Sequence, residues 1–145
     1  MRDFDELGAR VERAWEGADL DERAFPRIAA GALREARLHE RLGAADVVRW
    51  VLAAPALPEQ GDIEATFGDP PVTVYQGRRF HAQVLLWREG STATHRHGFC
   101  GAFAVLEGSS LHARYAFEER RRVSSRMSIG DLRLLDADVL ERGHV

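Results

Sequence analysis

The chain has no lysine, because all of its 20 basic residues are arginine. This absence excludes any mechanism that forms a Schiff base on a lysine side chain. The chain also has a single cysteine, which excludes an internal disulfide framework and fits a reducing compartment. No apolar run approaches the roughly 20 residues that cross a bilayer, and the charged, amphipathic N-terminus is unlike a signal peptide. These absences predict a cytoplasmic protein without a membrane partner.

The bulk composition is that of one ordinary globular domain. The chain has 145 residues, of which 45% are hydrophobic and 30% are charged. This length is sufficient to bury a core. The formal net charge of -3 gives no electrostatic reason to expect binding to nucleic acid or to an anionic membrane. Composition therefore gives no case for either of these partners.

The first third of the sequence predicts three helices. The first carries four large apolar residues at helical spacing, and Asp3 with Glu6 resembles a capping box at its start. A second helix is expected to begin near Pro26 and to end at Gly43. A third begins at Asp46 and stops before Pro55. The apolar residues of the first helix are Phe4, Leu7, Val11 and Trp15.

From Pro71 onward the apolar period falls from about 3.6 to about 2, which predicts strands. Residues 55–70 are rich in turn formers and form a connecting loop, and 71–76 and 79–87 are the first two strands. In the second strand one face holds Phe80, Ala82, Val84 and Leu86, and the other holds His81, Gln83, Leu85 and Trp87. Both faces are mostly apolar, as expected when one lines a barrel interior and the other packs under helices.

The last third predicts two further hairpins. Residues 101–110 and 110–119 are expected to pair about a turn at Gly108, and residues 120–136 give two strands about a Gly130–Asp131 turn. We expect helices over residues 1–58 as a cap and an antiparallel β-barrel or sandwich over 59–145. The count of about five to seven strands is below the eight of a jelly roll. This shortfall leaves a small barrel or a C-terminally incomplete one, and we favour the second.

The histidine pair His95 and His97 is the main candidate for a functional site. On a strand, residues at i and i+2 point to the same side, so both imidazoles can bind one divalent metal. On a helix the same spacing gives a poor chelate. Imidazole suits Fe, Zn, Cu and Ni alike, so the pair does not select the metal. An apolar strand on each side favours the strand geometry.

The segment around this pair resembles the first motif of the cupin superfamily. That motif has a glycine, His-x-His, a glutamate and a second glycine, and the chain has Gly90, the histidine pair, Gly101 in the glutamate slot, and Gly108. The sequence Trp-Arg-Glu-Gly at 87–90 resembles the lead-in of the cysteine dioxygenase-like thiol dioxygenases. Those enzymes replace the glutamate by cysteine or glycine. Cys100 lies one position before this slot, so we assign it no ligand role.

The resemblance implies a cupin jelly roll that oxidises a small thiol, such as cysteine, with O2. Three histidines would hold Fe(II), two of them being His95 and His97. Family members bind the substrate carboxylate through an arginine at the position of Gly77, so the resemblance assigns this role to Arg78 or Arg79. It places Tyr75 near the bound O2 or thiol, and Trp87 in the wall of the substrate cavity.

The third ligand and the activity stay open at this point. His144 is the only histidine after Gly130, and the ligand would otherwise lie beyond Val145. Two other functions fit the same residues. One is a cupin that binds or senses a small molecule without redox chemistry, and the other is a different metal-dependent cupin enzyme, such as an isomerase. A homodimer formed through sheet edges is a further open arrangement.

Overall fold

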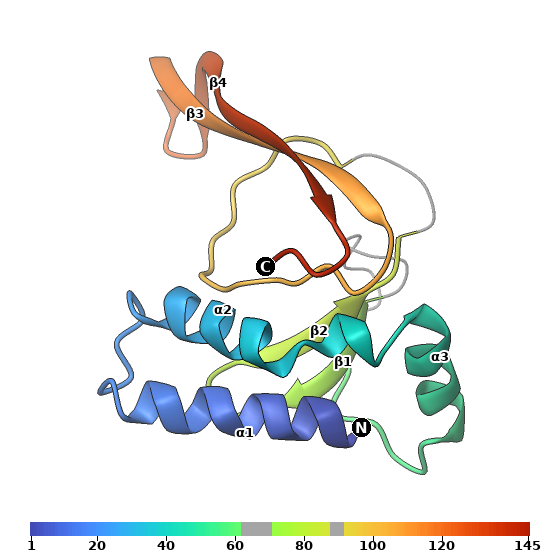
Figure 1. The fold of residues 1–145 in the computed structure, drawn as a ribbon. Coiled ribbons are helices and arrows are strands. Elements are labelled where there is room, and N and C mark those ends of the chain that lie inside the picture. Colours follow the sequence, from blue (N-terminus) through green and yellow to red (C-terminus); the bar gives the residue numbers. More distant parts are fainter. Residues whose placement is uncertain (62–70, 88–91) are drawn as a thin grey trace.

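The structure, a computed structural model, describes residues 1–61, 71–87 and 92–145. Within these ranges, three helices precede four strands, in about equal amounts of helix and strand (Figure 1). The predicted order of helices followed by antiparallel strands is therefore confirmed, whereas a predominance of strand is not. The elements are α1 (Arg2–Glu16), α2 (Phe25–Ala36), a 3-10 turn (Leu38–Glu40), α3 (Ala44–Ala53), β1 (Pro71–Gln76), β2 (His81–Leu85), β3 (Ser109–Ser124) and β4 (Met127–Glu141).

The core lies between α1, α2 and the β1–β2 sheet. All four apolar residues that predict α1 are buried, and they share this core with Val72 and Val74 of β1. The Trp15 ring lies 4.6 Å from the ring of Phe25, centroid to centroid, and 6.5 Å from that of Phe80. Each fully buried large apolar side chain contributes about 1.5–3 kcal/mol to folding. The helices and the first two strands therefore form one packed unit.

The start of α1 differs from the prediction, since the expected capping box is absent. The helix begins at Arg2, and Met1 at its N-cap provides no side-chain hydrogen bond. Asp3 instead accepts from Arg41 at 3.0 Å, and Glu6 accepts from Arg2 at 2.7 Å. Asp3 lies in the first turn, where its carboxylate still interacts favourably with the helix dipole.

The prediction that α2 ends at Gly43 is wrong. The helix ends at Ala36, because Arg37 adopts a left-handed conformation (φ 45°, ψ 42°) and the chain continues as the 3-10 turn. Arg41 donates to the Ala36 carbonyl at 3.0 Å, which satisfies a group at the helix end. This reversal lets Leu38 and Leu42 enter the core.

Gly43 instead lies at the N-cap of α3, which starts at Ala44 and not at Asp46. The Asp46 carboxylate accepts a hydrogen bond from the Gly43 N–H at 2.9 Å. Asp46 therefore caps the helix from within its first turn, whereas the sequence predicts Asp46 to be the first residue of the helix.

β1 and β2 form a two-stranded antiparallel sheet with a bulge at Val74. The Val72–Val84 and Tyr75–Ala82 pairs face the helices, and the Thr73–Gln83 pair lies on the opposite face. The alternation predicted for 79–87 is confirmed, because Phe80, Ala82 and Val84 pack on the core while His81 and Gln83 are exposed. Residues 62–70 of the predicted loop lie outside the described residues.

β3 and β4 form one long hairpin in place of the two predicted hairpins. Residues 101–108 form no strand, and the hairpin turns at Ser125 and Arg126. The predicted turn at Gly130 and Asp131 is wrong, since both residues lie inside β4. A side chain at Gly130 would collide with the backbone carbonyl of Glu118 on β3. The glycine therefore permits close strand approach and does not form a turn.

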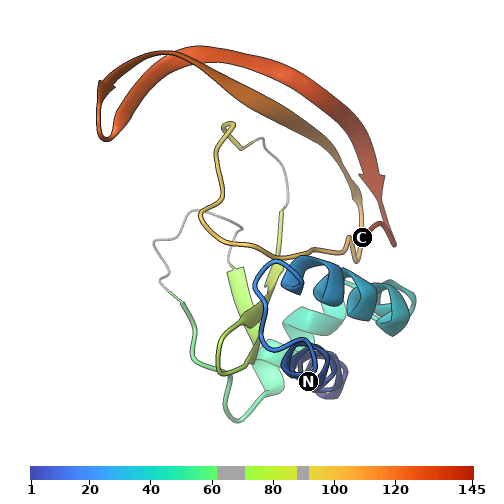
Figure 2. The same ribbon diagram turned by 90° about the vertical axis from the view of Figure 1, so that its left-hand side faces the viewer.

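The hairpin arches away from the helical unit (Figure 2). It is attached at its base, where Gly143 and His144 exchange backbone hydrogen bonds of 2.8 and 2.9 Å with Val105. The two sheets are separate, so the ranges 1–61, 71–87 and 92–145 contain no closed barrel and the jelly roll is not confirmed. No helix in the same ranges is long and apolar enough to cross a membrane.

Candidate functional site

His95 and His97 lie side by side in the segment 92–100. Their ring centroids are 4.7 Å apart, with an angle of 75° between the planes, and both side chains are exposed. The His97 ring also lies 4.8 Å from the Phe99 ring. The segment, yellow in Figure 2, lies between the hairpin and the helical unit. The structure therefore brings the two predicted metal ligands together, although not on a regular strand.

The distance between the two ring centroids can be compared with that of two imidazoles on one metal ion. When two imidazoles bind one metal ion with a nitrogen–metal–nitrogen angle of about 90° and nitrogen–metal distances of about 2.1 Å, their ring centroids lie roughly 4.5 Å apart. The Nδ1 atom of His95 lies 2.8 Å from the Ala93 carbonyl oxygen. When Nδ1 donates to that carbonyl, Nε2 is the unprotonated nitrogen that a metal requires.

A third ligand is not assembled around the pair. In the described part of the chain no group of three His, Cys, Asp or Glu side chains could hold a metal. His144 lies in the turn after β4, where its Nδ1 accepts from the Glu141 N–H at 3.0 Å. Cys100 donates from Sγ to the Glu22 carbonyl at 3.6 Å. Gly90 and residues 88–89 of the lead-in lie outside the described residues.

Tyr75 lies on the helix-facing side of the β1–β2 sheet. Its ring packs on the Gly8 backbone and lies 5.6 Å from the Phe80 ring. Burial raises the pKa of Tyr75 to about 12, and a hydrogen bond with the Glu12 carboxylate adds to this effect. The phenol is therefore protonated at neutral pH and donates to Glu12.

Arg78 and Arg79 lie in the turn between β1 and β2, close to the same acidic residue. The Arg78 N–H donates to Glu12 Oε1 at 3.3 Å. Both arginines line a small cavity of about 120 Å³ together with Glu12, Trp15, Glu16, Leu20 and Phe80. Tyr75 and the two arginines thus gather around Glu12, and among the described residues they do not gather around the histidine pair. Trp87, which follows β2, is 46% exposed.

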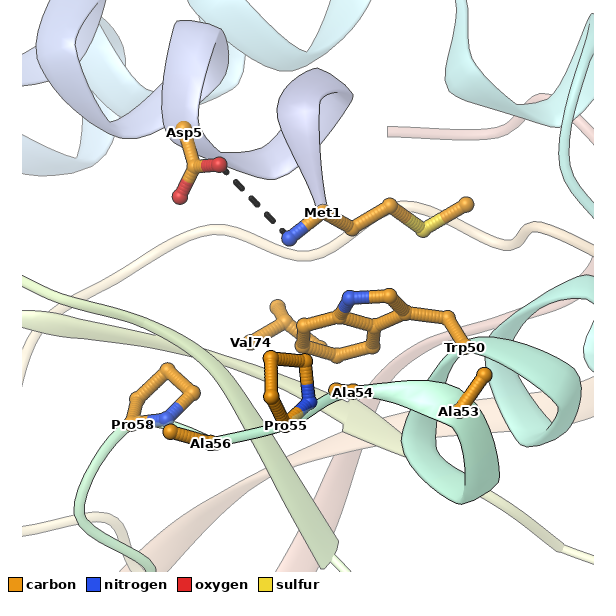
Figure 3. Close-up of a pocket in the computed structure, with 9 residues that line it drawn as sticks. All are labelled: Met1, Asp5, Trp50, Ala53, Ala54, Pro55, Ala56, Pro58 and Val74. Atoms are coloured by element: carbon orange, nitrogen blue, oxygen red, sulfur yellow. Dashed lines mark ion pairs between the residues drawn. The ribbon is translucent and has the colours of Figure 1, made fainter.

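A second cavity, of about 430 Å³, was not predicted from the sequence. Figure 3 shows the Trp50 indole between Met1 and Pro55, with the Met1 ammonium group paired to Asp5 at 3.6 Å. Ala53, Ala54, Ala56, Pro58 and Val74 complete the lining. Among the described residues that line it, the charged groups are the ammonium and one carboxylate, and they pair with each other. The described lining therefore offers no side chain placed for acid–base or nucleophilic chemistry.

Glu107 is a structural residue that the sequence analysis missed. Its carboxylate accepts from the Ala44 N–H at 2.8 Å, at the N-terminus of α3. Glutamate at this end of a helix satisfies a free N–H group and interacts with the helix dipole. It connects the segment that follows the histidine pair to the helical unit. A contact between residues 63 positions apart has no local signal in the sequence.

Compared with known proteins, the chain matches no family model, no curated protein and no solved structure.

Proposed function

We propose that the chain is a cupin-type thiol dioxygenase, in which His95 and His97 are two of three ligands to Fe(II). The observation that carries the proposal is the pair of imidazoles 4.7 Å apart, with His95 Nδ1 at the Ala93 carbonyl. The sequence around the pair resembles the cupin motif, with Gly101 in place of the glutamate ligand. The proposal assigns the third ligand to a histidine, with His144 as the candidate.

Iron, when bound, would orient a thiolate and O2 and supply electrons for O2 activation. Both oxygen atoms would be transferred to sulfur, giving a sulfinate, so the reaction needs no external reductant. The residues of the chain would position the substrate. Arg78 or Arg79 would bind its carboxylate through a charge-assisted hydrogen bond, and Trp87 would form a wall of the cavity. The Tyr75 phenol, protonated at neutral pH, would act as a hydrogen-bond donor.

The proposal is tested by metal analysis of protein purified without oxygen. We expect stoichiometric iron in the full chain and its loss in the His95→Ala/His97→Ala variant, while His112→Ala retains it as the matched control. A His144→Ala variant tests the third ligand by the same measurement. Iron content equal in all variants would refute the site.

Activity is then measured as O2 uptake with cysteine and with 3-mercaptopropionate. Uptake that depends on the thiol, with a sulfinate as product, supports the dioxygenase. Iron-loaded protein without thiol-dependent uptake would refute the dioxygenase and leave the metal site intact.

A second candidate is a cupin module that binds a small molecule without redox chemistry. Two observations favour it. Tyr75 packs on α1 and not beside the histidine pair, and glycine occupies position 77, where the resemblance expects the carboxylate-binding arginine. Under this alternative the protein binds metal but consumes no O2 with either thiol.

A further inference from the structure

The two faces of the β3–β4 hairpin differ sharply in chemistry. Directly paired residues share a face and successive residues alternate, so the register assigns each side chain. The first face, which we call the apolar face, holds Leu111, Ala113, Tyr115, Phe117, Leu132, Leu134, Ala137 and Val139. The opposite, charged face holds the cross-strand ion pairs Arg114–Asp136, Arg120–Asp131 and Arg133–Glu118.

The apolar face is uncovered. Its six large side chains are each about half exposed or more, from Tyr115 at 40% to Leu111 at 74%. Together they present roughly 600 Å² of contiguous side-chain surface, at the upper limit for the largest apolar patch of a typical monomer. An isolated two-stranded hairpin is only marginally stable in water, and it needs a partner for its apolar face.

The helical unit does not supply this partner. His112, on the charged face of β3, lies against the Phe103 ring, with the two ring centroids 5.8 Å apart, and Phe103 belongs to the segment before the hairpin. At its base the hairpin therefore turns its charged face toward the rest of the chain.

The total exposed area is also large for a protein of this size. The chain exposes 10964 Å², whereas a compact monomer of this mass exposes about 7500 Å². A standard protein interface buries about 800 Å² from each partner, and obligate homodimers bury more. The excess of about 3500 Å² is sufficient for such an interface.

The charges at the two ends of the hairpin are complementary. At the tip, residues 120–126 carry four arginines and no acid, and at the base, residues 136–141 carry three acids and no base. By the register, Arg122 at the tip and Glu141 at the base lie on the apolar face, and Arg126 lies in the turn. Within the described residues, Arg126 and Glu141 form no ion pair. A second copy in the opposite orientation would place each tip on the base of its partner.

We propose that two copies of this chain associate through the apolar faces of their β3–β4 hairpins, packed antiparallel about a two-fold axis. The interface is isologous, so each favourable contact occurs twice. The apolar faces form its centre, as in the packing of two sheets. The arginine-rich tips meet the acidic bases at its two ends, which fixes the orientation.

The first test compares the full chain with two variants by sedimentation equilibrium. Leu132→Asp places a charge in the centre of the apolar face, and we expect it to weaken dimerisation by roughly a hundredfold or more, because one leucine is lost from each copy. Ile129→Asp is the matched control. Ile129 is 43% exposed on the charged face, so the control remains dimeric. Circular dichroism checks that both variants are folded.

The second test examines the antiparallel orientation. Arg126→Glu and Glu141→Arg each place like charges at both ends of a homodimer, so each alone is expected to dimerise more weakly than the wild type. Mixed in equal amounts they restore opposite charges at both ends and form a heterodimer, detected by native mass spectrometry.

A wild-type chain that is monomeric at all concentrations would overturn the proposal, since the apolar face would then be covered by another segment or by an unrelated partner. A dimer that Leu132→Asp leaves intact would also overturn it. Charge variants that each dimerise as well as the wild type, with no preference for each other in the mixture, would overturn the antiparallel arrangement.

Discussion

The Tyr75 ring lies directly on the backbone of Gly8, so β1 and α1 meet where the helix has no side chain. The same phenol donates to Glu12, one helical turn further along. Residues at i and i+4 lie on the same face of a helix, so Gly8 and Glu12 both contact the Tyr75 side chain. This contact positions the first helix on the sheet.

We expect Gly8→Ala to destabilise the protein, although alanine is the better helix former. A methyl group at this position would overlap the Tyr75 ring, and relief of such overpacking costs about 1–3 kcal/mol. Thermal denaturation measures the loss. Gly31→Ala in α2 is the control, because that position has open space around it. There the propensity gain of about 1 kcal/mol should raise the melting temperature. An equal gain at both positions would contradict the packing described for Tyr75.

The ionisation of Tyr75 should reduce stability at high pH. Its pKa is raised from 10.0 to about 12 in the folded protein. A group whose pKa is raised in the folded state stabilises the protein fully at a pH below its pKa in the unfolded state. This stabilisation is lost as the pH rises through its pKa in the folded state. The free energy of unfolding should therefore fall between pH 10 and about pH 12. In Tyr75→Phe this part of the decrease is absent. Ultraviolet titration of the phenol should show one tyrosine that ionises near pH 12 in the wild type only.

Gln60 is expected to stabilise β1 through its side-chain amide. The amide accepts from the Thr73 N–H at 2.9 Å and donates to the Thr73 carbonyl at 3.0 Å, as a neighbouring strand would. Thr73 is 2% exposed, so both backbone groups would be left buried without a partner in Gln60→Ala. Such a loss costs about 1–3 kcal/mol for each unsatisfied group. Gln76→Ala, at an exposed position, is the control and should change the melting temperature little. A Gln60→Ala protein as stable as the control would refute this role.

Glu107 is expected to stabilise α3 from outside the helix. Loss of a capping acceptor costs about 1 kcal/mol, so Glu107→Ala should lower the melting temperature by roughly 2–4 °C. Glu107→Gln retains an acceptor for the Ala44 N–H and loses only the charge, so its effect should be smaller. Glu59→Ala controls for removal of an exposed glutamate that forms no ion pair among the described residues. Equal melting temperatures for all three variants would show that the contact contributes nothing.

The sequence predicted helices well where burial follows one helix face. The four apolar residues of α1 are all in the core, and α2 begins beside Pro26, at Phe25, as expected. The helix ends were predicted less well, because they depend on contacts from elsewhere. Arg37 leaves the helical conformation at a position without glycine, and the Ala36 carbonyl is satisfied by Arg41 from beyond the turn.

The strand turns were mispredicted because glycine has more than one structural role. Gly130 was interpreted as a turn, yet it lies opposite Glu119 within the hairpin, where the close approach of β3 excludes a side chain. The true turn, Ser125–Arg126, contains neither glycine nor proline. For the site, local spacing was sufficient to bring His95 and His97 together. Tyr75 and Arg78 form hydrogen bonds with Glu12, and Arg79 lines the same cavity as Glu12. No local pattern could connect these residues to such a distant glutamate.

The separate attachment of the hairpin has a consequence for folding cooperativity. β3 pairs only with β4 among the described strands, whereas β1 and β2 share their core with the helices. In a free monomer the amide protons of the hairpin should therefore exchange with solvent through local opening, at a free energy well below that of the helical unit. The chain would then unfold in two stages, and the temperature of the first stage would depend on protein concentration if the hairpins pair between copies.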